Sequence, residues 1–259
     1  MKSIITILIV AVSLMSCKQN SSKLENTQPL LTKEYPAEIE AIFEAHGGID
    51  TWNSMNNLCF TIEKEKGNET HTIDLKSRKT RIEGSGFILG FDGKKAWLDQ
   101  DEIHFKLNSA RFYHSLMFYF YAMPFVLGDD GVKFSEAKPI EFEGVSYPGT
   151  KIDFEANTGD SPNDEYIIYR DPKTNEMAWL AYTVTYGKRN KNNRFSFIRY
   201  DKWIDINGLK LPSEINWYNR DQGVLAEKVS GYSFTKPSIT KTILDPSIFR
   251  KPERAKFAN

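Results

Sequence analysis

The chain has few cysteines and no excess of charge of either sign. Two cysteines in 259 residues exclude a disulfide-rich scaffold. The 34 basic and 34 acidic side chains cancel, which argues against a nucleic-acid-binding protein, because such proteins cluster basic residues. A hydrophobic share of 40% excludes a disordered chain, and an aromatic share of 13% favours strands, a large pocket, or both. The composition therefore predicts a globular protein.

Common catalytic and metal-binding motifs are also missing. The sequence has no G-x-S-x-G, no P-loop and no G-x-G-x-x-G. The four histidines are His46, His71, His104 and His114. Their spacing along the sequence does not match that of the ligands of a zinc site. Acidic clusters at 99–102, 129–130 and 160–165 are interpreted as solvated loops, with calcium binding as the alternative. We expect no cofactor and no metal, although distant strands could still bring together a carboxylate pair for glycoside hydrolysis.

The hydrophobic run near the N-terminus is short. Apolar residues follow Lys2 and fill positions 4–12, whereas a membrane-spanning helix needs about 20. The run ends at Leu14-Met15-Ser16-Cys17, which resembles the lipobox of bacterial lipoproteins. The resemblance implies that residues 1–16 are a signal peptide and that Cys17 becomes the acylated first residue, anchoring the protein in a membrane. An ordinary secretory signal with an incidental cysteine is the alternative.

The segment after the cysteine is polar. Residues 17–34 contain Ser, Asn and Pro and are interpreted as a flexible tether. Lys18 stands where the best-known inner-membrane retention signal has Asp, so the outer membrane is favoured. Whether the protein faces the periplasm or the cell surface stays open. Residues 35–259 are expected to form a single domain.

The body of the chain is predicted to be mainly β with few helices. A helix is expected after Pro36, ending at Gly47-Gly48. Asp92-Gly93 and Asn207-Gly208 are typical hairpin turns. Strands are expected at 58–64, 70–75, 79–83, 87–92, 96–99, 103–106, 151–155, 166–170, 178–186, 194–203, 210–218 and 226–234. This spacing predicts a large curved antiparallel sheet or half-open β-barrel.

Residues 108–127 depart from this pattern. A helix capped by Asn108 or Ser109 should run through Ala122, and Pro124 should stop it. Its sequence is apolar nearly all round, so it must be covered on most sides. It is either a core helix that plugs the sheet or a helix that lines a cavity for a hydrophobic ligand. The candidate ligand-binding residues are Phe112, Leu116, Tyr119, Phe120, Met123 and Trp97, the last of which is expected to face the concave side.

Two further features allow a functional and a structural interpretation. Cys59 lies in a strand-like run and is interpreted as a structural thiol. The basic segment 188–194 is interpreted as a soluble turn, with contact to anionic lipid headgroups as the alternative.

Three segments resemble the LolA/LolB-like superfamily of lipoprotein carriers. They read FDGKKAW at 91–97, YRDPKTN at 169–175 and WIDINGLKLP at 203–212. Residues 45–52 and 118–125 are similar to an uncharacterised group of outer-membrane-type lipoproteins within it. The resemblance implies a half-open antiparallel barrel with helices packed in its mouth, which binds acyl chains, lipids or lipoproteins without catalysis. It gives a location for the ligand but no residue-by-residue match to the carriers.

Three functions follow from these observations. The first is a lipid-anchored cell-envelope protein that binds a hydrophobic ligand in the half-barrel and is not an enzyme. The second is a scaffolding or accessory lipoprotein of the envelope without a small ligand. The third is a hydrolase. The expected partners are the membrane through Cys17, a hydrophobic small molecule or lipid, and an envelope protein, but no nucleic acid.

Overall fold

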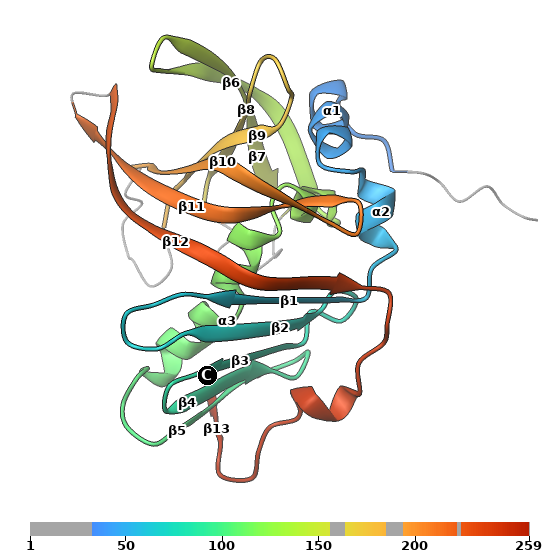
Figure 1. Ribbon diagram of the computed structural model, residues 1–259, viewed down its shortest axis with the longest axis vertical. Coiled ribbons are helices and arrows are strands. Elements are labelled where there is room, and N and C mark those ends of the chain that lie inside the picture. The colour runs from blue at the N-terminus through green and yellow to red at the C-terminus, as the bar shows by residue number, and fades with distance from the viewer. Residues whose placement is uncertain (1–32, 156–163, 185–193, 222–223, 259) are drawn as a thin grey trace, which may run out of the picture. The chain divides into compact units, whose positions relative to one another are not determined.

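The computed structural model describes residues 33–155, 164–184, 194–221 and 224–258. The described residues from Tyr35 onward form a compact unit, and Figure 1 shows how its elements are arranged. The signal peptide, Cys17, most of the tether, residues 160–163 of one acidic cluster and residues 188–193 of the basic segment lie outside the described residues.

The helices and strands follow one another along the chain in a simple order. The helices are α1 (Ala37–Ala45), α2 (Ile49–Asn53) and α3 (Leu107–Tyr121), with the short 3-10 turns η1 (Phe125–Gly128) and η2 (Pro246–Phe249). The first strands are β1 (Asn57–Ile62), β2 (Glu69–Asp74), β3 (Thr80–Gly84), β4 (Phe87–Phe91) and β5 (Ala96–Gln100). The later ones are β6 (Val132–Phe142), β7 (Val145–Phe154), β8 (Tyr166–Arg170), β9 (Met177–Tyr182), β10 (Ser196–Ile206), β11 (Leu209–Asp221), β12 (Val224–Thr240) and β13 (Lys256–Ala258).

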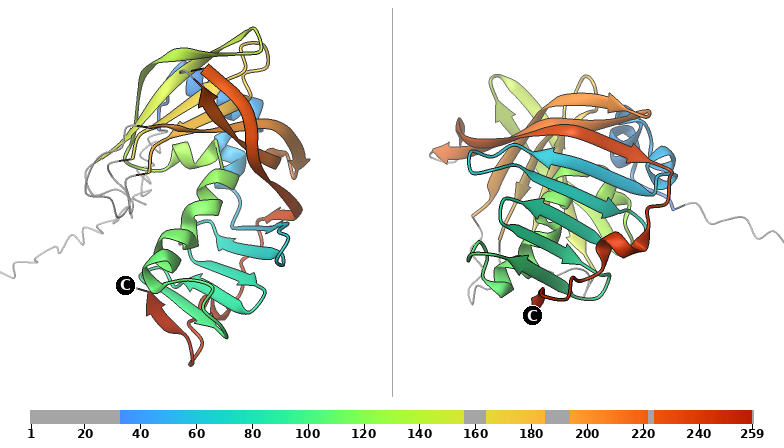
Figure 2. Two further views of the ribbon diagram at one scale, coloured as in Figure 1. Left: turned by 90° about the vertical axis from the view of Figure 1, so that its left-hand side faces the viewer. Right: turned by 60° about the horizontal axis from the view of Figure 1, so that its bottom comes forward.

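All these strands belong to one antiparallel sheet. The order is β13-β5-β4-β3-β2-β1-β12-β11-β10-β9-β8-β7-β6, so β12 joins the half built from β1–β5 to the half built from β6–β11. The end strands β13 and β6 do not pair with each other in the described part of the chain, and the sheet is not closed into a barrel. Figure 2 shows its curvature. The predicted fold class, a large curved antiparallel sheet with few helices, is confirmed.

Turn residues place the hairpins where the sequence predicts them. Asn207 and Gly208 both have positive φ, 51° and 83°, as a tight two-residue hairpin turn requires. In the β4–β5 turn, the Asp92 carboxylate accepts hydrogen bonds from the backbone N–H groups of Lys94 and Lys95, each at 2.8 Å. These local bonds fix the register of the strands on either side.

Two parts of the sheet differ from the prediction. The strand expected at 103–106 is a loop, because Gln100 Oε1 accepts from the N–H groups of His104 and Phe105 at 3.0 Å and turns the chain toward α3. The long hairpin of β6 and β7 was not predicted beyond residues 151–155. Its turn is Glu143-Gly144, with φ of 51° and 77°.

The end of α1 is held tightly against the sheet. His46 is fully buried, its Nε2 accepts from the backbone N–H of Met177 at 3.0 Å, and its carbonyl accepts from the N–H of Lys210 at 2.9 Å. Gly47 lies directly over the β10–β11 turn, where a Cβ would come within 1.9 Å of the Gly208 carbonyl oxygen. The His-Gly-Gly sequence is therefore explained by packing.

Helix α3 lies along the inner side of the curved sheet, as the left view of Figure 2 shows. Near its start Ala110 packs with Ile82 and Leu98 of the β1–β5 half, and further along Phe120 and Tyr121 join the main core. The backbone carbonyl of Phe120 also accepts from the hydroxyl group of Tyr200 at 2.9 Å. One side of the helix is thus part of the core, as the plug interpretation predicts.

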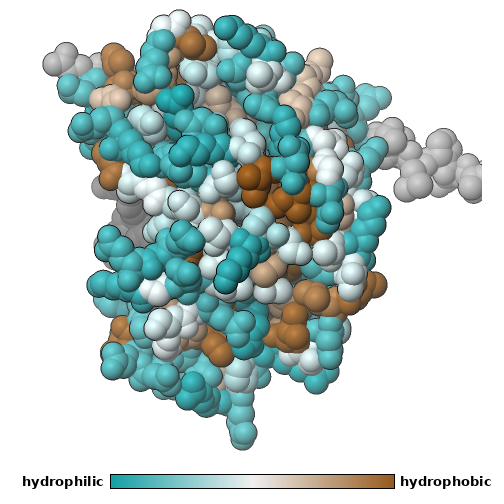
Figure 3. Space-filling view, viewed as in Figure 1, coloured by the Kyte–Doolittle hydropathy of each residue, from teal (hydrophilic) through white to brown (hydrophobic). Residues whose placement is uncertain are grey.

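The surface seen in Figure 3 is mostly hydrophilic, with hydrophobic side chains in separate small groups. No helix in the described part of the chain is long and apolar enough to cross a membrane.

Candidate functional site

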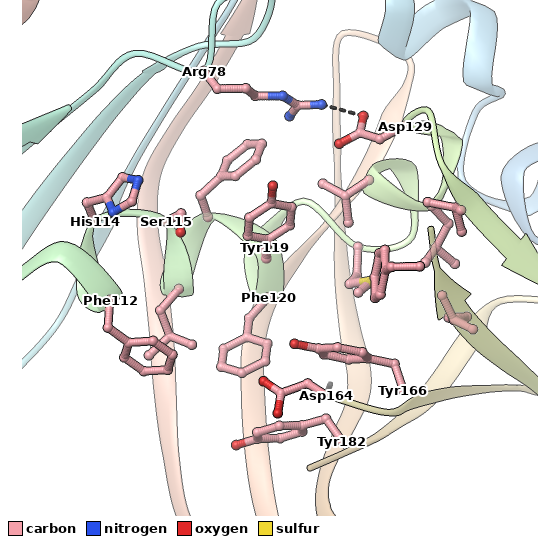
Figure 4. Close-up of a pocket in the computed structure, with 18 of the residues that line it drawn as sticks. Arg78, Phe112, His114, Ser115, Tyr119, Phe120, Asp129, Asp164, Tyr166 and Tyr182 are labelled. Carbon is pink, nitrogen blue, oxygen red and sulfur yellow. Dashed lines mark hydrogen bonds and ion pairs between the residues drawn. The ribbon is translucent and has the colours of Figure 1, made fainter. Parts of the chain in front are cut away.

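A cavity of about 320 Å³ lies beside α3 (Figure 4). Its lining comes from α3 and η1, from the β2–β3 turn, and from the ends of β6–β9. The apolar and aromatic lining residues are Phe91, Phe112, Leu116, Phe118, Tyr119, Phe120, Met123, Val126, Leu127, Val132, Ile152, Phe154, Tyr166, Tyr182 and Val184. The polar ones are Arg78, Thr80, His114, Ser115, Asp129, Asp130, Asp164 and Thr183. The cavity is therefore mainly apolar, with polar groups at a few positions.

Five of the six predicted ligand-binding residues line this cavity: Phe112, Leu116, Tyr119, Phe120 and Met123. Phe120 and Met123 are buried, whereas Tyr119 remains 42% exposed. The helix that plugs the sheet is thus also the helix that lines the cavity, because its core side and its cavity side are different.

Trp97 does not line the cavity, contrary to the prediction. It is fully buried, but it pairs with Gly90 of β4 and Phe257 of β13. Its strand neighbour Leu98 packs with α3, so Trp97 points to the opposite face. Arg81, which also pairs with Gly90, donates to the carbonyl of Ile248 in η2 at 3.4 Å.

Aromatic rings form one wall of the cavity. Tyr166 and Tyr182 are stacked with 6.4 Å between ring centroids, and Phe120 lies 5.2 Å from Tyr182. Trp217 Nε1 donates to the Tyr182 hydroxyl at 2.9 Å and fixes that ring. Burial raises the pKa of Tyr166, with a further rise from the Asp164 charge, and burial also raises the pKa of Tyr182. These hydroxyl groups therefore stay protonated, and the charged side chain beside them is the carboxylate of Asp164 (Figure 4).

Polar residues close the end of the cavity next to the β2–β3 turn. Arg78 Nη2 forms a charged hydrogen bond with Asp129, which follows η1 (Figure 4). The Arg78 guanidinium also lies over the Phe118 ring, 5.0 Å from its centroid. The Arg78 backbone N–H donates to the Asp74 carbonyl at 2.8 Å, which holds the turn in place.

A buried ionic cluster holds the start of α3 against β2. Tyr113 donates to Glu69 Oε2 at 2.6 Å, and Lys64 Nζ lies 2.6 Å from Glu69 Oε1. Burial favours a higher pKa for Glu69, but interactions with His71, Lys64 and Tyr113 outweigh it and lower the pKa to about 2. His71 Nε2 is 3.6 Å from Glu69, and burial lowers the pKa of this histidine. The cluster fixes the helix from which the cavity is built.

The lining offers mainly apolar contacts. In the part of the chain that the structure describes, no group of three His, Cys, Asp or Glu side chains could hold a metal ion. Cys59 is only half buried, and Thr72 Oγ1 contacts its sulfur at 3.8 Å.

Sequence reasoning missed Arg78, Tyr166 and Tyr182, because no linear motif connects the β2–β3 turn with β8 and β9.

The chain belongs to a protein family of unknown function (DUF6503), whose sequence model matches residues 70–230. No curated protein matches the sequence.

Several solved structures are similar in fold. A DUF1329 family protein from Desulfovibrio piger has a TM-score of 0.48 at 9% identity, over 83% of this chain and 96% of that one. A LolA superfamily protein from Nitrosomonas europaea has a TM-score of 0.44 at 10% identity, over 75% and 88%. An outer membrane lipoprotein-sorting protein domain from Vibrio parahaemolyticus has a TM-score of 0.38 at 10% identity, over 80% and 96%.

Proposed function

We propose that this protein is a lipid-anchored cell-envelope protein that binds one hydrophobic molecule, an acyl chain or a lipid, in the cavity beside α3, without catalysis. The observation that carries the proposal is the mainly apolar cavity itself. Its volume of about 320 Å³ lies within the range of small-molecule sites, which bury most of the ligand against apolar and aromatic side chains.

The lining supports an apolar ligand in energetic terms. Removing apolar surface from water contributes about 25 cal/mol per Å², so a chain enclosed along Leu116, Phe120 and Tyr182 gains affinity with each buried methylene. Because the pKa values of Tyr166 and Tyr182 are raised, no phenolate forms beside the chain near neutral pH.

The membrane anchor is a separate part of the proposal. It rests on the lipobox-like Leu14-Met15-Ser16-Cys17 and on the polar tether of residues 17–34. An acylated Cys17 and a flexible tether would keep the binding domain close to a membrane, with the outer membrane favoured by Lys18. A membrane-tethered domain with an apolar cavity is suited to taking up molecules that have low solubility in water.

A binding experiment tests the cavity. The full chain carrying Cys17→Ser, which has no acyl group of its own, is titrated with the neutral fluorescent probe N-phenyl-1-naphthylamine. Saturable binding is expected, and Leu116→Asp should weaken it at least tenfold, because an unpaired charge in an apolar site costs several kcal/mol. Leu116 is only partly buried, so the variant should still fold.

Ile103→Asp is the matched control. Ile103 is 87% exposed, precedes α3 and does not line the cavity, so this variant should bind the probe as the parent does. Thermal unfolding of both variants separates a binding defect from a folding defect. No saturable binding by the parent, or equal binding by the folded Leu116→Asp variant, would show that the proposed site is wrong.

A further inference from the structure

One hydrogen-bond donor at the wall of the cavity has no acceptor. Arg78 Nη1 is buried from solvent, and among the described residues no acceptor lies within hydrogen-bond distance of it. Arg78 lines the cavity, and its other terminal nitrogen, Nη2, is bonded to Asp129. Leaving a buried donor unsatisfied is costly, and such groups are rare in native proteins.

The position of Arg78 is fixed by its surroundings. It has a φ of 58°, in the left-handed region that side chains other than glycine seldom adopt, and its N–H is bonded to the Asp74 carbonyl. The Phe118 ring lies beneath the guanidinium, and Asp129 holds one edge of it. The side chain is thus preorganised, and Nη1 is held ready for a partner that the described residues do not supply.

The charge of Arg78 already has a partner. The ion pair with Asp129 balances the guanidinium, so Nη1 requires an acceptor atom and not a second negative charge. Asp130, the residue after Asp129, also lines the cavity and adds a further negative side chain. An uncharged acceptor oxygen fits this end better than a carboxylate or phosphate does.

We propose that Arg78 Nη1 binds the carbonyl oxygen of an ester or amide at the head of a single-chain neutral amphiphile, whose hydrocarbon chain lies along α3. This inference rests on the proposed function, because it assigns the ligand class of the same cavity. Figure 4 shows Arg78 at one end of the lining and the aromatic residues Phe120, Tyr166 and Tyr182 away from it. The Asp164 carboxylate lies beside Tyr166 and Tyr182, so the hydrocarbon chain would contact the aromatic rings and the apolar residues of α3.

Two ligands that differ only in the carbonyl group test the inference. The full chain with Cys17→Ser is loaded with N-phenyl-1-naphthylamine, which is then displaced by 1-monododecanoylglycerol (an ester) or by 1-O-dodecylglycerol (the ether without the carbonyl). The ester should bind about tenfold more tightly, the difference expected for one hydrogen bond to a charged donor. Dodecanoate, tested at pH 8, should bind more weakly than the ester.

Arg78→Lys is the informative variant. A lysine keeps a positive charge opposite Asp129 but lacks the second nitrogen of the guanidinium, so ester and ether should bind equally well and the ether should bind as it does to the parent. Lys94→Gln, at an exposed position in the β4–β5 turn, should leave both affinities unchanged.

The possible results are distinguishable. Equal binding of ester and ether by the parent, an ester preference that survives in Arg78→Lys, or tighter binding of dodecanoate than of the ester would each overturn the assignment of Arg78, while probe binding to the cavity would still stand. If the parent binds neither the probe nor any of the ligands, the proposed function itself is wrong.

Discussion

The fully buried His46 connects the stability of the protein to pH. Burial lowers the pKa of His46 to about 4, whereas an unfolded chain has a histidine pKa of about 6.5. The unfolded chain therefore takes up the proton first, and stability that is complete above pH 6.5 is lost as the pH falls toward 4. We expect His46 alone to make the free energy of unfolding in urea about 2–3 kcal/mol smaller at pH 4.5 than at pH 7.5.

A variant of His46 distinguishes its contribution to the pH dependence of stability from that of the other buried histidine. His71 also has a lowered pKa and contributes in the same direction. His46→Gln can still offer an acceptor to the Met177 N–H but does not titrate, so the loss between pH 7.5 and 4.5 should become smaller without disappearing. An unchanged pH dependence in this variant would contradict the role of His46.

A substitution of Trp97 should affect the stability of the protein but not ligand binding. The ring is fully buried on the face of the sheet opposite α3, so Trp97→Ala should lower the free energy of unfolding by about 3–5 kcal/mol. The cavity is not lined by this residue, and the folded fraction should bind N-phenyl-1-naphthylamine with the parent's affinity. Denaturant unfolding and probe titration, both at low temperature, measure the two effects. Weaker binding by fully folded Trp97→Ala would show that this ring contributes to the cavity after all.

At the scale of elements, the joint between α1 and the β10–β11 hairpin depends on one glycine. A Cβ on Gly47 would lie 1.9 Å from the Gly208 carbonyl oxygen, and its φ of 101° is unfavourable for any other residue. The Gly47→Ala variant should therefore have a clearly lower melting temperature than the Gly48→Ala variant. At Gly48 the φ of 87° is also unfavourable, but a Cβ would have 3.7 Å of space, so this control should lose only about 1–3 kcal/mol. Equal melting temperatures of the two variants would contradict this account.

Much of the sheet could be predicted because short local sequences determine its turns. Asp92-Gly93 and Asn207-Gly208 carry their own hairpin signal, and the strands beside them were predicted to within a few residues. The β6–β7 hairpin carries a weaker signal, since Glu143-Gly144 is not a typical turn pair and β6 is largely exposed, without a clear apolar face. The loop at 103–106 has the composition of a strand, but the side chain of Gln100 bonds to its backbone.

The candidate site could be predicted only in part, for a similar reason. The α3 side of the cavity follows from the composition of a single helix, and five of its residues were predicted to line a cavity. Arg78 and Tyr182 come from elements far apart in the chain and meet only in the folded sheet. Trp97 was placed on the wrong face because alternation in β5 does not tell which face is concave when both faces are covered.

At the scale of the molecule, the strands of the described residues form a curved sheet that is not closed, with α3 on its inner side (Figure 2). The cavity lies beside this helix (Figure 4). Helix α3 is tied to the sheet by Tyr113 at its start and by the Phe120 carbonyl near its end. The cavity walls are thereby fixed to a framework of strands, and the proposed ligand binding should not depend on the proposed anchor.

Membrane attachment and ligand binding should therefore be separable. If Cys17 carries the acyl chains, Cys17→Ser should move the protein from the membrane fraction to the soluble fraction, because Cys17 is the residue that the lipobox-like sequence marks for acylation. Cys59→Ser is the control: it removes the other cysteine of the chain and should leave the protein with the membranes. Fractionation after a high-salt wash distinguishes acyl anchoring from electrostatic adsorption, which salt screens. Persistence of Cys17→Ser in the washed membranes would rule out the lipid anchor, and the cavity would then have to be explained without a tether to a membrane.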